Sequence, residues 1–308
     1  QNLIATTAGS YTVTGTTSDG CTATSVAQSV VVNPNPVATV TNSGSSILCS
    51  GDNTTLTAPS GMSSYLWSDG STSQSVTASS AGNYAVTVTN ADGCSATSSA
   101  IAITTSSIST PNITSSGSTS ICSGSSVTLS VPTGYASYSW SDGSTTNSIS
   151  PTTSGNYTVT VTNADGCSTT TTATAVTVNP LPTATVSTAS GDFDFCDGSS
   201  LSLDAPTGVS GYQWYKDGTA LAGATVATLS ATSGGSYAVQ VTSSDGCSSL
   251  SSAQAVTKNA LPTASISNGS ALSFCDGGSV TLSAPSGMSY AWSDGSTTQS
   301  ITQSSSGQ

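Results

Sequence analysis

The chain has 308 residues and a formal net charge of −12, because 14 acidic residues face only two lysines. It contains no histidine, arginine or glutamate, so most side chains used for acid–base catalysis and for phosphate binding are missing. This composition disfavours an enzyme and a nucleic-acid partner. It also disfavours direct membrane insertion, because no apolar run approaches the ~20 residues that span a bilayer.

A repeat of about 73 to 80 residues organises the sequence. Each copy begins with a cysteine, continues to a tryptophan 17 or 18 residues later, and ends with Gly-x-Tyr, a Val/Thr run and Asp-Gly-Cys. In chain order we expect the C-terminal half of a domain at 1–36, complete domains at 37–109, 110–181 and 182–260, and the N-terminal half of a domain at 261–308. Proline-bearing stretches separate them and predict short, stiff joints.

Within a repeat, apolar residues alternate with polar ones, as in residues 127–131 and 157–162. This period of two is typical of strands with one buried face. Asp-Gly pairs between the runs predict hairpin turns. We therefore expect an all-β fold, a tandem array of small immunoglobulin-like β-sandwich domains with one disulfide each.

Three motifs carry a family resemblance: Cys-Ser-Gly-Ser-Ser-Val-Thr-Leu-Ser from Cys122, Tyr-Ser-Trp-Ser-Asp-Gly from Tyr138, and Gly-Asn-Tyr-Thr-Val-Thr-Val-Thr-Asn-Ala-Asp-Gly-Cys from Gly155. With near copies elsewhere, they resemble the immunoglobulin-like and polycystic-kidney-disease-type repeats of giant bacterial surface adhesins, especially those exported by type IX secretion in gliding Bacteroidetes. The third repeat departs in its central loops. The resemblance implies an extracellular, cell-surface location and a role in adhesion or spacing.

Eight cysteines in such repeats indicate disulfides. The recurrence of two cysteines within each repeat, 45 residues apart in the first two repeats and six residues further apart in the third, predicts the pairs Cys49–Cys94, Cys122–Cys167 and Cys196–Cys247. Cys21 and Cys275 are then left without partners in the chain. A metal site is disfavoured, since histidine and Cys-x-x-Cys are absent.

The aromatic residues fit core positions better than an exposed sugar-binding platform. The expected core residues are Trp67, Trp140, Trp214, Trp292, Tyr84, Tyr157 and Tyr237.

Ten of the 14 acidic residues directly precede glycine, where turn geometry explains them. In the segment from Gly191 to Asp197, Asp192 and Asp194 alternate with apolar residues and lead into the turn at Asp197, and the carboxylates of Asp192, Asp194 and Asp197 are the one calcium candidate. Otherwise no cofactor is expected.

The two ends of the chain fall at the same phase of the repeat. We expect either a window of a longer continuous array, or subunits that join head to tail, with Cys275 linked to Cys21 of the neighbour.

The predicted function is a structural or adhesive segment of an extracellular filament or stalk, acting as a spacer and multivalent weak adhesin. The predicted partners are neighbouring repeats or identical chains, and surface glycans or other cells. The alternatives are a dedicated glycan- or calcium-dependent binding module and a head-to-tail polymerising subunit.

Overall fold

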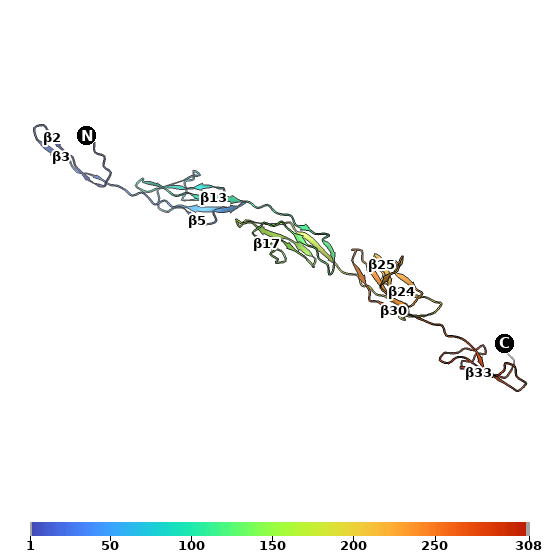
Figure 1. The fold of residues 1–308 in the computed structure, drawn as a ribbon. Helices are drawn as coiled ribbons and strands as arrows, with labels where there is room; N and C mark the ends of the chain where they lie inside the picture. The colour runs from blue at the N-terminus through green and yellow to red at the C-terminus, as the bar shows by residue number, and fades with distance from the viewer. Residues whose placement is uncertain (1, 306–308) are drawn as a thin grey trace. The chain divides into compact units, whose positions relative to one another are not determined.

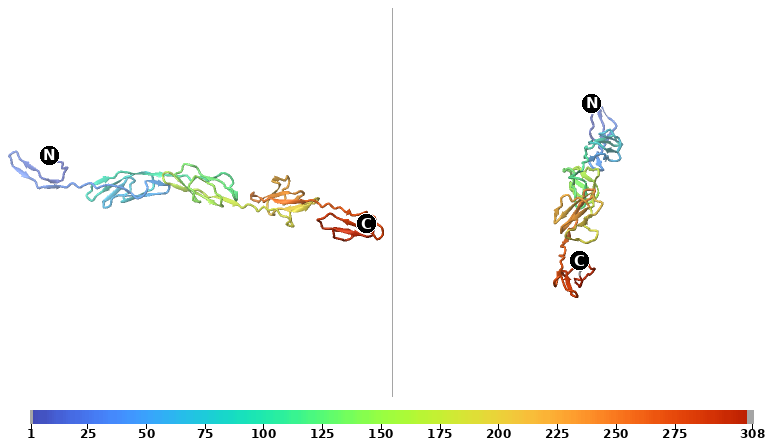
Figure 2. Two further views of the ribbon diagram at one scale, coloured as in Figure 1. Left: turned by 60° about the horizontal axis from the view of Figure 1, so that its bottom comes forward. Right: turned by 90° about the vertical axis from the view of Figure 1, so that its right-hand side faces the viewer.

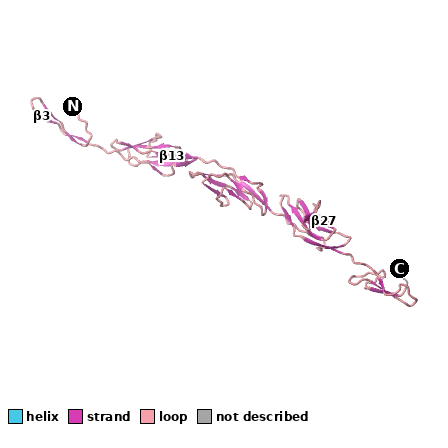
Figure 3. Ribbon diagram, viewed as in Figure 1, coloured by secondary structure: helices cyan, strands magenta, loops and turns pink. Residues whose placement is uncertain are grey.

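The computed structural model describes residues 2–305, and strands are the only regular elements among them (Figures 1 and 3). Contacts divide the chain into two compact bodies. The N-terminal body runs up to residue 119 and includes residues 126–177; the C-terminal body comprises residues 120–125 and those from 178 onward. The all-β immunoglobulin-like fold is confirmed, while the predicted domain boundaries remain a prediction.

The first repeat, residues 37–109, folds as two β layers in the N-terminal body. One layer is the sheet β5-β7-β9, and the other contains the sheets β12-β11-β8 and β10-β13-β6. The strands are β5 (Thr41–Asn42), β6 (Ile47–Cys49), β7 (Thr54–Thr57), β8 (Ser64–Trp67), β9 (Ser75–Ala78), β10 (Gly82–Tyr84), β11 (Val86–Thr89), β12 (Ser95–Thr97) and β13 (Ile101–Ser106).

The core of this repeat lies between the two layers. Leu56, Val86 and Val88 have no exposed surface, and Trp67 is 2% exposed. Strands β7 and β11 alternate buried and half-buried residues, as the period of two predicts. Burying one such side chain contributes roughly 1.5–3 kcal/mol.

Two strand registers hold the second layer together. Trp67 on β8 lies opposite Val86 on the antiparallel β11. Cys49 on β6 lies opposite Ser106 on β13, and these two strands run parallel. The first cysteine of the repeat is therefore fixed beside the end of its last strand.

The second repeat uses the same arrangement. In the N-terminal body its sheets are β14-β16-β18 and β17-β20-β21, and β19 pairs with β22. The strands are β14 (Thr114–Ser115), β16 (Leu129–Ser130), β17 (Ser137–Trp140), β18 (Ser148–Ile149), β19 (Gly155–Tyr157), β20 (Val159–Thr162), β21 (Ser168–Thr170) and β22 (Thr174–Asn179).

The C-terminal body holds β15 (Ser120–Cys122) and the third repeat. A six-stranded sheet faces the pair β24-β27, and it repeats both registers, with Trp214 opposite Val239 and Cys196 opposite Asn259. The strands are β23 (Asp194–Cys196), β24 (Leu201–Asp204), β25 (Gly211–Lys216), β26 (Thr219–Ala220), β27 (Thr228–Ala231), β28 (Gly235–Thr242), β29 (Ser248–Leu250) and β30 (Gln254–Asn259).

Among the described residues, two segments each form only half of a sandwich; we call them the N-terminal half-repeat (residues 2–36) and the C-terminal half-repeat (residues 261–305). The first contains only two-stranded ladders, β1-β4 and β2-β3, seen as a narrow blue loop in Figure 2. The second contains the sheet β31-β32-β33. Their strands are β1 (Gly9–Tyr11), β2 (Thr14–Thr16), β3 (Thr22–Thr24), β4 (Gln28–Val30), β31 (Ser267–Asn268), β32 (Val280–Ser283) and β33 (Ser300–Gln303).

The predicted aromatic core is confirmed in the complete repeats and fails in the C-terminal half-repeat. Trp67, Trp140 and Trp214 are 2%, 3% and 0% exposed, and Tyr84, Tyr157 and Tyr237 are buried. Each of these tyrosine hydroxyls donates to the carbonyl four residues earlier, the geometry of a tyrosine corner. Trp292 is only half-buried, because the strand that covers its counterparts is missing from this half-repeat.

The Asp-Gly turns follow the predicted geometry. In the turn after Trp67, the backbone N–H of Ser71 donates to the Asp69 carboxylate at 2.9 Å. Gly70 has a φ of 90°, a backbone conformation that is energetically costly for any residue with a side chain.

Candidate functional site

The two disulfides in the described residues join successive repeats. Cys49 bonds to Cys167 and Cys122 bonds to Cys247, with Cα–Cα distances of 5.4 and 5.5 Å. The predicted pairs within repeats, Cys49–Cys94, Cys122–Cys167 and Cys196–Cys247, are therefore wrong. The first cysteine of one repeat pairs instead with the second cysteine of the next.

Strand geometry explains why pairing within a repeat fails. Cys94 directly precedes β12, whereas Cys49 lies opposite Ser106 at the end of β13. At about 3.3 Å per residue, the 12 residues from Cys94 to Ser106 span roughly 35–40 Å. A disulfide needs Cα atoms within about 7 Å. The two cysteines of one repeat thus lie at opposite ends of the sandwich.

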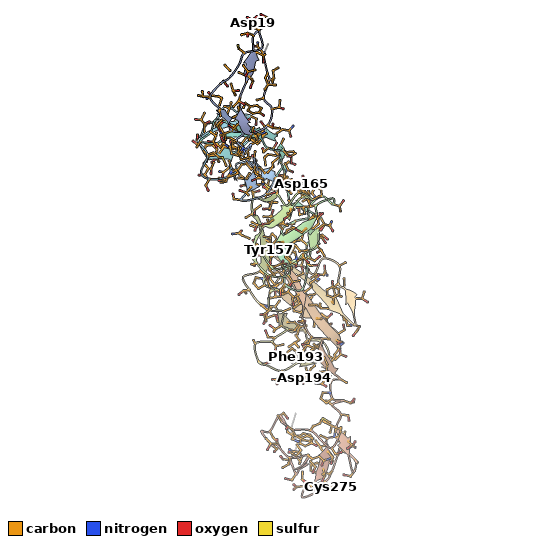
Figure 4. The ribbon with its side chains drawn as sticks, turned by 90° about the vertical axis from the view of Figure 1, so that its left-hand side faces the viewer. Asp19, Tyr157, Asp165, Phe193, Asp194 and Cys275 are labelled. Atoms are coloured by element: carbon orange, nitrogen blue, oxygen red, sulfur yellow. A yellow bond between two sulfur atoms is a disulfide. The ribbon has the colours of Figure 1, made fainter. Side chains whose placement is uncertain are left out.

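Polar contacts surround the Cys49–Cys167 bond. The Ser106 hydroxyl donates to the Asp165 carboxylate at 2.6 Å and accepts from the Asn163 amide at 3.1 Å. Thr110 and Thr169 hydroxyls lie 2.6 Å apart. Figure 4 labels Asp165, which belongs to the turn that carries Cys167. These contacts hold the turn of the second repeat against the end of the first.

Asn163 shapes the turn that presents Cys167. Its side-chain oxygen accepts from the backbone N–H groups of Asp165 and Cys167 at 3.1 and 2.9 Å. The Cys167 sulfur lies 3.8 Å from the Ser106 carbonyl oxygen. One asparagine therefore both folds the turn and binds the preceding repeat.

The Cys122–Cys247 bond has comparable surroundings in the C-terminal body. The backbone N–H of Ser123 donates to the Asn179 carbonyl at 2.8 Å. The Asn179 amide donates to the Ser120 hydroxyl at 2.9 Å. Cys122 is thus fixed beside Asn179, the counterpart of Ser106 in the repeat.

Four cysteines remain free in the part of the chain that the structure describes: Cys21, Cys94, Cys196 and Cys275. For Cys21 and Cys275 this agrees with the sequence. The Cys94 thiol lies 3.6 Å from the Asn33 carbonyl, and the Asn90 amide donates to the Pro34 carbonyl at 3.1 Å. Cys94 therefore contacts the preceding half-repeat much as Cys167 contacts the first repeat.

Cys196 occupies the position that Cys122 has in its own repeat. It lies opposite Asn259, and the backbone N–H of Asp197 donates to the Asn259 carbonyl at 2.8 Å. The same bond joins Ser123 to Asn179 beside the bonded Cys122. Cys196 is thus arranged like a cysteine that pairs with the following repeat.

Two of the three calcium candidates have protein partners for their carboxylates. Asp194, labelled in Figure 4, accepts from the Asn259 amide at 2.9 Å, and Asp197 forms an ion pair with Lys258 at 2.6 Å. The hydrogen bond and the charge of Lys258 hold the pKa of Asp197 below its ordinary value. Asp192 is exposed. Residues 2–305 contain no group of three or more such side chains able to hold a metal ion.

Comparisons with known proteins give only distant similarity. No protein-family model matches the chain, and neither does any curated protein. Solved structures that resemble it include Drosophila OTK extracellular domains 3–5, with a TM-score of 0.32, 16% identity and coverage of 70% of this chain and 94% of that one. A 1.5-MDa bacterial ice-binding adhesin matches with a TM-score of 0.30, 15% identity and coverage of 74% and 100%.

The function must therefore be inferred from the chain's own contacts. Within the described residues the structure has no helix long and apolar enough to cross a membrane.

Sequence reasoning missed the junction residues Asn90, Asn163, Ser106 and Asp165. A signal for three of them, Asn90, Asn163 and Asp165, was present, because the same Asn-Ala-Asp-Gly-Cys segment occurs in the first and second repeats. Turn geometry accounts for the Asp-Gly pair and for the side-chain oxygen of the asparagine, which accepts from the backbone of the turn. The side-chain amide of the same asparagine contacts the preceding repeat.

Proposed function

We propose that the chain is a spacer segment of an extracellular surface filament or stalk, in which successive complete repeats are joined by disulfides. The observation that carries this proposal is the Cys49–Cys167 disulfide between successive repeats. Disulfides persist in oxidising environments outside the cytoplasm, which supports an extracellular location. The Ser- and Thr-rich composition, with charges on only 5% of the residues, suits a surface exposed to water.

The junction limits bending between the first and second repeats. A single connecting segment, even a short and stiff proline-bearing one, would leave the two sandwiches some freedom to reorient. The disulfide adds a second covalent connection, and the Ser106–Asp165 and Thr110–Thr169 contacts surround it. Repeats tied at two points transmit tension and keep their spacing.

An adhesive role fits the same design. Many identical repeats would present weak binding surfaces at regular intervals, and multivalency would raise their combined affinity without a deep pocket. Surface glycans and neighbouring cells are the partners we propose. Membership of the type IX secreted adhesins of gliding bacteria belongs to this proposal, and so does the absence of enzymatic activity.

Small-angle scattering tests the spacer function. The double variant C49S/C167S should broaden the distribution of intramolecular distances relative to the oxidised wild-type chain, because one of two connections is lost. T87S, a conservative change on the exposed side of β11, serves as the control and should leave the distribution unchanged. Equal distributions for the double variant and the wild type would contradict a spacer stiffened by disulfides.

A further inference from the structure

We propose that Cys49 is the attachment site for a small thiol, and that this modification opens the junction between the first and second repeats. The thiol enters a cavity lined with hydroxyl groups, attacks the Cys49 sulfur and releases Cys167. The consequence of this reaction rests on the proposed spacer function, because the bond that opens is the one that stiffens the spacer.

The two cysteines of the junction disulfide differ in exposure. Cys49 is half-buried, whereas Cys167 is only 2% exposed. The second disulfide has the same asymmetry, since Cys122 is half-buried and Cys247 has no exposed surface. Thiol–disulfide exchange begins with attack of a thiolate on one of the two sulfur atoms, and access decides which one. At both junctions the accessible cysteine is the first of its repeat, and the buried cysteine is the leaving group.

An open cavity of about 310 Å³ leads to Cys49 and not to Cys167. The turn after β6 forms one side of it, because the backbone N–H of Asp52 donates to the Cys49 carbonyl at 2.9 Å. The ends of β9 and β13 form the other sides. The hydroxyl-bearing residues of the wall are Ser50, Ser79, Thr105, Ser106 and Ser107. Most of these are exposed, so the cavity opens to solvent.

Charge also distinguishes the two sides of the disulfide. Among the described residues that line the cavity none is charged, and their hydroxyl groups can donate hydrogen bonds to a thiolate. In the turn that carries Cys167, the Asp165 carboxylate accepts from the Ser106 hydroxyl at 2.6 Å. The Cys167 sulfur itself lies 3.8 Å from the Ser106 carbonyl oxygen. These oxygens repel an anion that approaches Cys167, so access and electrostatics both direct a thiolate to Cys49.

The reaction conserves atoms and electrons. The thiolate of the small thiol attacks the Sγ atom of Cys49, and a new sulfur–sulfur bond forms as the bond to Cys167 breaks. Cys167 leaves as a thiolate and takes up the proton that the small thiol gave to the buffer. The sulfur of the small thiol is oxidised and that of Cys167 is reduced. In the reverse step the Cys167 thiolate attacks Cys49, expels the small thiol and closes the junction.

The wall of the cavity indicates the class of thiol. Hydroxyl groups offer hydrogen bonds to a polar molecule, and no cation lines the cavity to pair with the carboxylate of a peptide thiol. The volume admits a small molecule. We therefore expect a small thiol without other charged groups, and 2-mercaptoethanol serves as the probe.

The test uses the oxidised 308-residue chain, with its free cysteines first blocked by N-ethylmaleimide. A brief exposure to 2-mercaptoethanol under native conditions is stopped with acid, the reagent is removed, and newly released thiols are labelled with deuterated N-ethylmaleimide. Peptide mass spectrometry should find 2-mercaptoethanol on Cys49 and the deuterated label on Cys167 at least tenfold more often than the reverse. Equal amounts of both arrangements, or no reaction before the chain unfolds, would overturn the proposal.

A bulky residue in the cavity tests the route. Ser79→Trp should slow the opening of the Cys49–Cys167 bond at least fivefold, because it fills the space through which the thiol approaches. Thr77→Trp is the matched control, since Thr77 is also exposed but does not line the cavity. It should react at the wild-type rate. An undiminished rate in Ser79→Trp would mean that the thiol does not use the cavity, and the proposal would be wrong.

Failure of the thiol site can be told apart from failure of the spacer function. Attack at Cys167, combined with a broadened distance distribution in C49S/C167S, removes the thiol site and leaves the spacer. Attack at Cys49, combined with an unchanged distribution in C49S/C167S, confirms the thiol site and removes the spacer.

Discussion

The strands at residues 9–16 and 82–89 have closely related sequences but different surroundings. Five of the eight positions are identical, and both segments contain the Gly-x-Tyr element. Val86 has no exposed surface, whereas Val13 is 70% exposed. Local sequence is thus sufficient to form the strand, but its burial depends on the other half of the sandwich. Four predictions test this difference, in order of decreasing effect.

The largest effect is expected from a charge at the buried valine. Val86→Asp would bury an unpaired carboxylate and should lower the free energy of unfolding of the first repeat by about 4 kcal/mol or more. Val13→Asp should leave the unfolding of dilute monomers unchanged. Denaturant titration followed by tryptophan fluorescence measures both; a comparable loss in V13D would mean that the half-repeat is already packed.

Loss of a junction disulfide should rank second. Cys49→Ser with Cys167→Ser opens a ring spanning a sequence separation of 118 residues. In the chain-entropy model this costs about 5 kcal/mol, and measured losses range from about 2 to 5 kcal/mol. Calorimetry should show a lower unfolding temperature for the first two repeats in this variant than in the wild type. An unchanged unfolding temperature would mean that the Cys49–Cys167 disulfide does not stabilise them.

A single hydrogen bond of the tyrosine corner should have a smaller effect. The Tyr157 hydroxyl donates to the Thr153 carbonyl at 3.0 Å, so Tyr157→Phe should cost about 1 kcal/mol. Tyr11 makes the same bond to Thr7 at 3.0 Å, but in the exposed half-repeat. Tyr11→Phe should therefore have no measurable effect in equilibrium unfolding. An equal decrease in the free energy of unfolding in Tyr11→Phe and Tyr157→Phe would contradict the role of burial.

The smallest effect concerns pH. Lys258 lowers the pKa of Asp197 from its ordinary value of 3.8, so the pair stabilises the fold above that pH. The contribution is lost as the pH falls through the lowered pKa of the folded state. Asp197→Asn should slightly reduce the acid dependence of the unfolding midpoint of the third repeat. A steeper acid dependence in this variant would contradict the assignment.

The sequence was sufficient to predict the strands, the turns and the core of the complete repeats. Each depends on local patterns: period-two alternation, Asp-Gly pairs, and aromatic residues at fixed distances. Trp67 and Tyr84 occupy the predicted core positions. Trp292 does not, because its burial requires a strand that belongs to the other half of the sandwich.

The sequence could not identify the cysteine partners. In a repeated sequence, Cys49 has an equivalent relation to Cys94 and to Cys167, one period further along. Only the end of the sandwich on which each cysteine lies separates these choices. That information comes from the parallel pairing of β6 with β13, which places Cys49 beside Ser106 and far from Cys94.

The two observed disulfides enclose overlapping stretches of the backbone. One ring runs from Cys49 to Cys167 and the other from Cys122 to Cys247. Every peptide bond between Cys49 and Cys247 lies inside at least one ring, including those in the exposed joints. A protease that cuts the chain once anywhere in this stretch leaves the two fragments covalently attached. The repeats therefore gain a redundancy of connection that protects an exposed polypeptide from severance by a single nick.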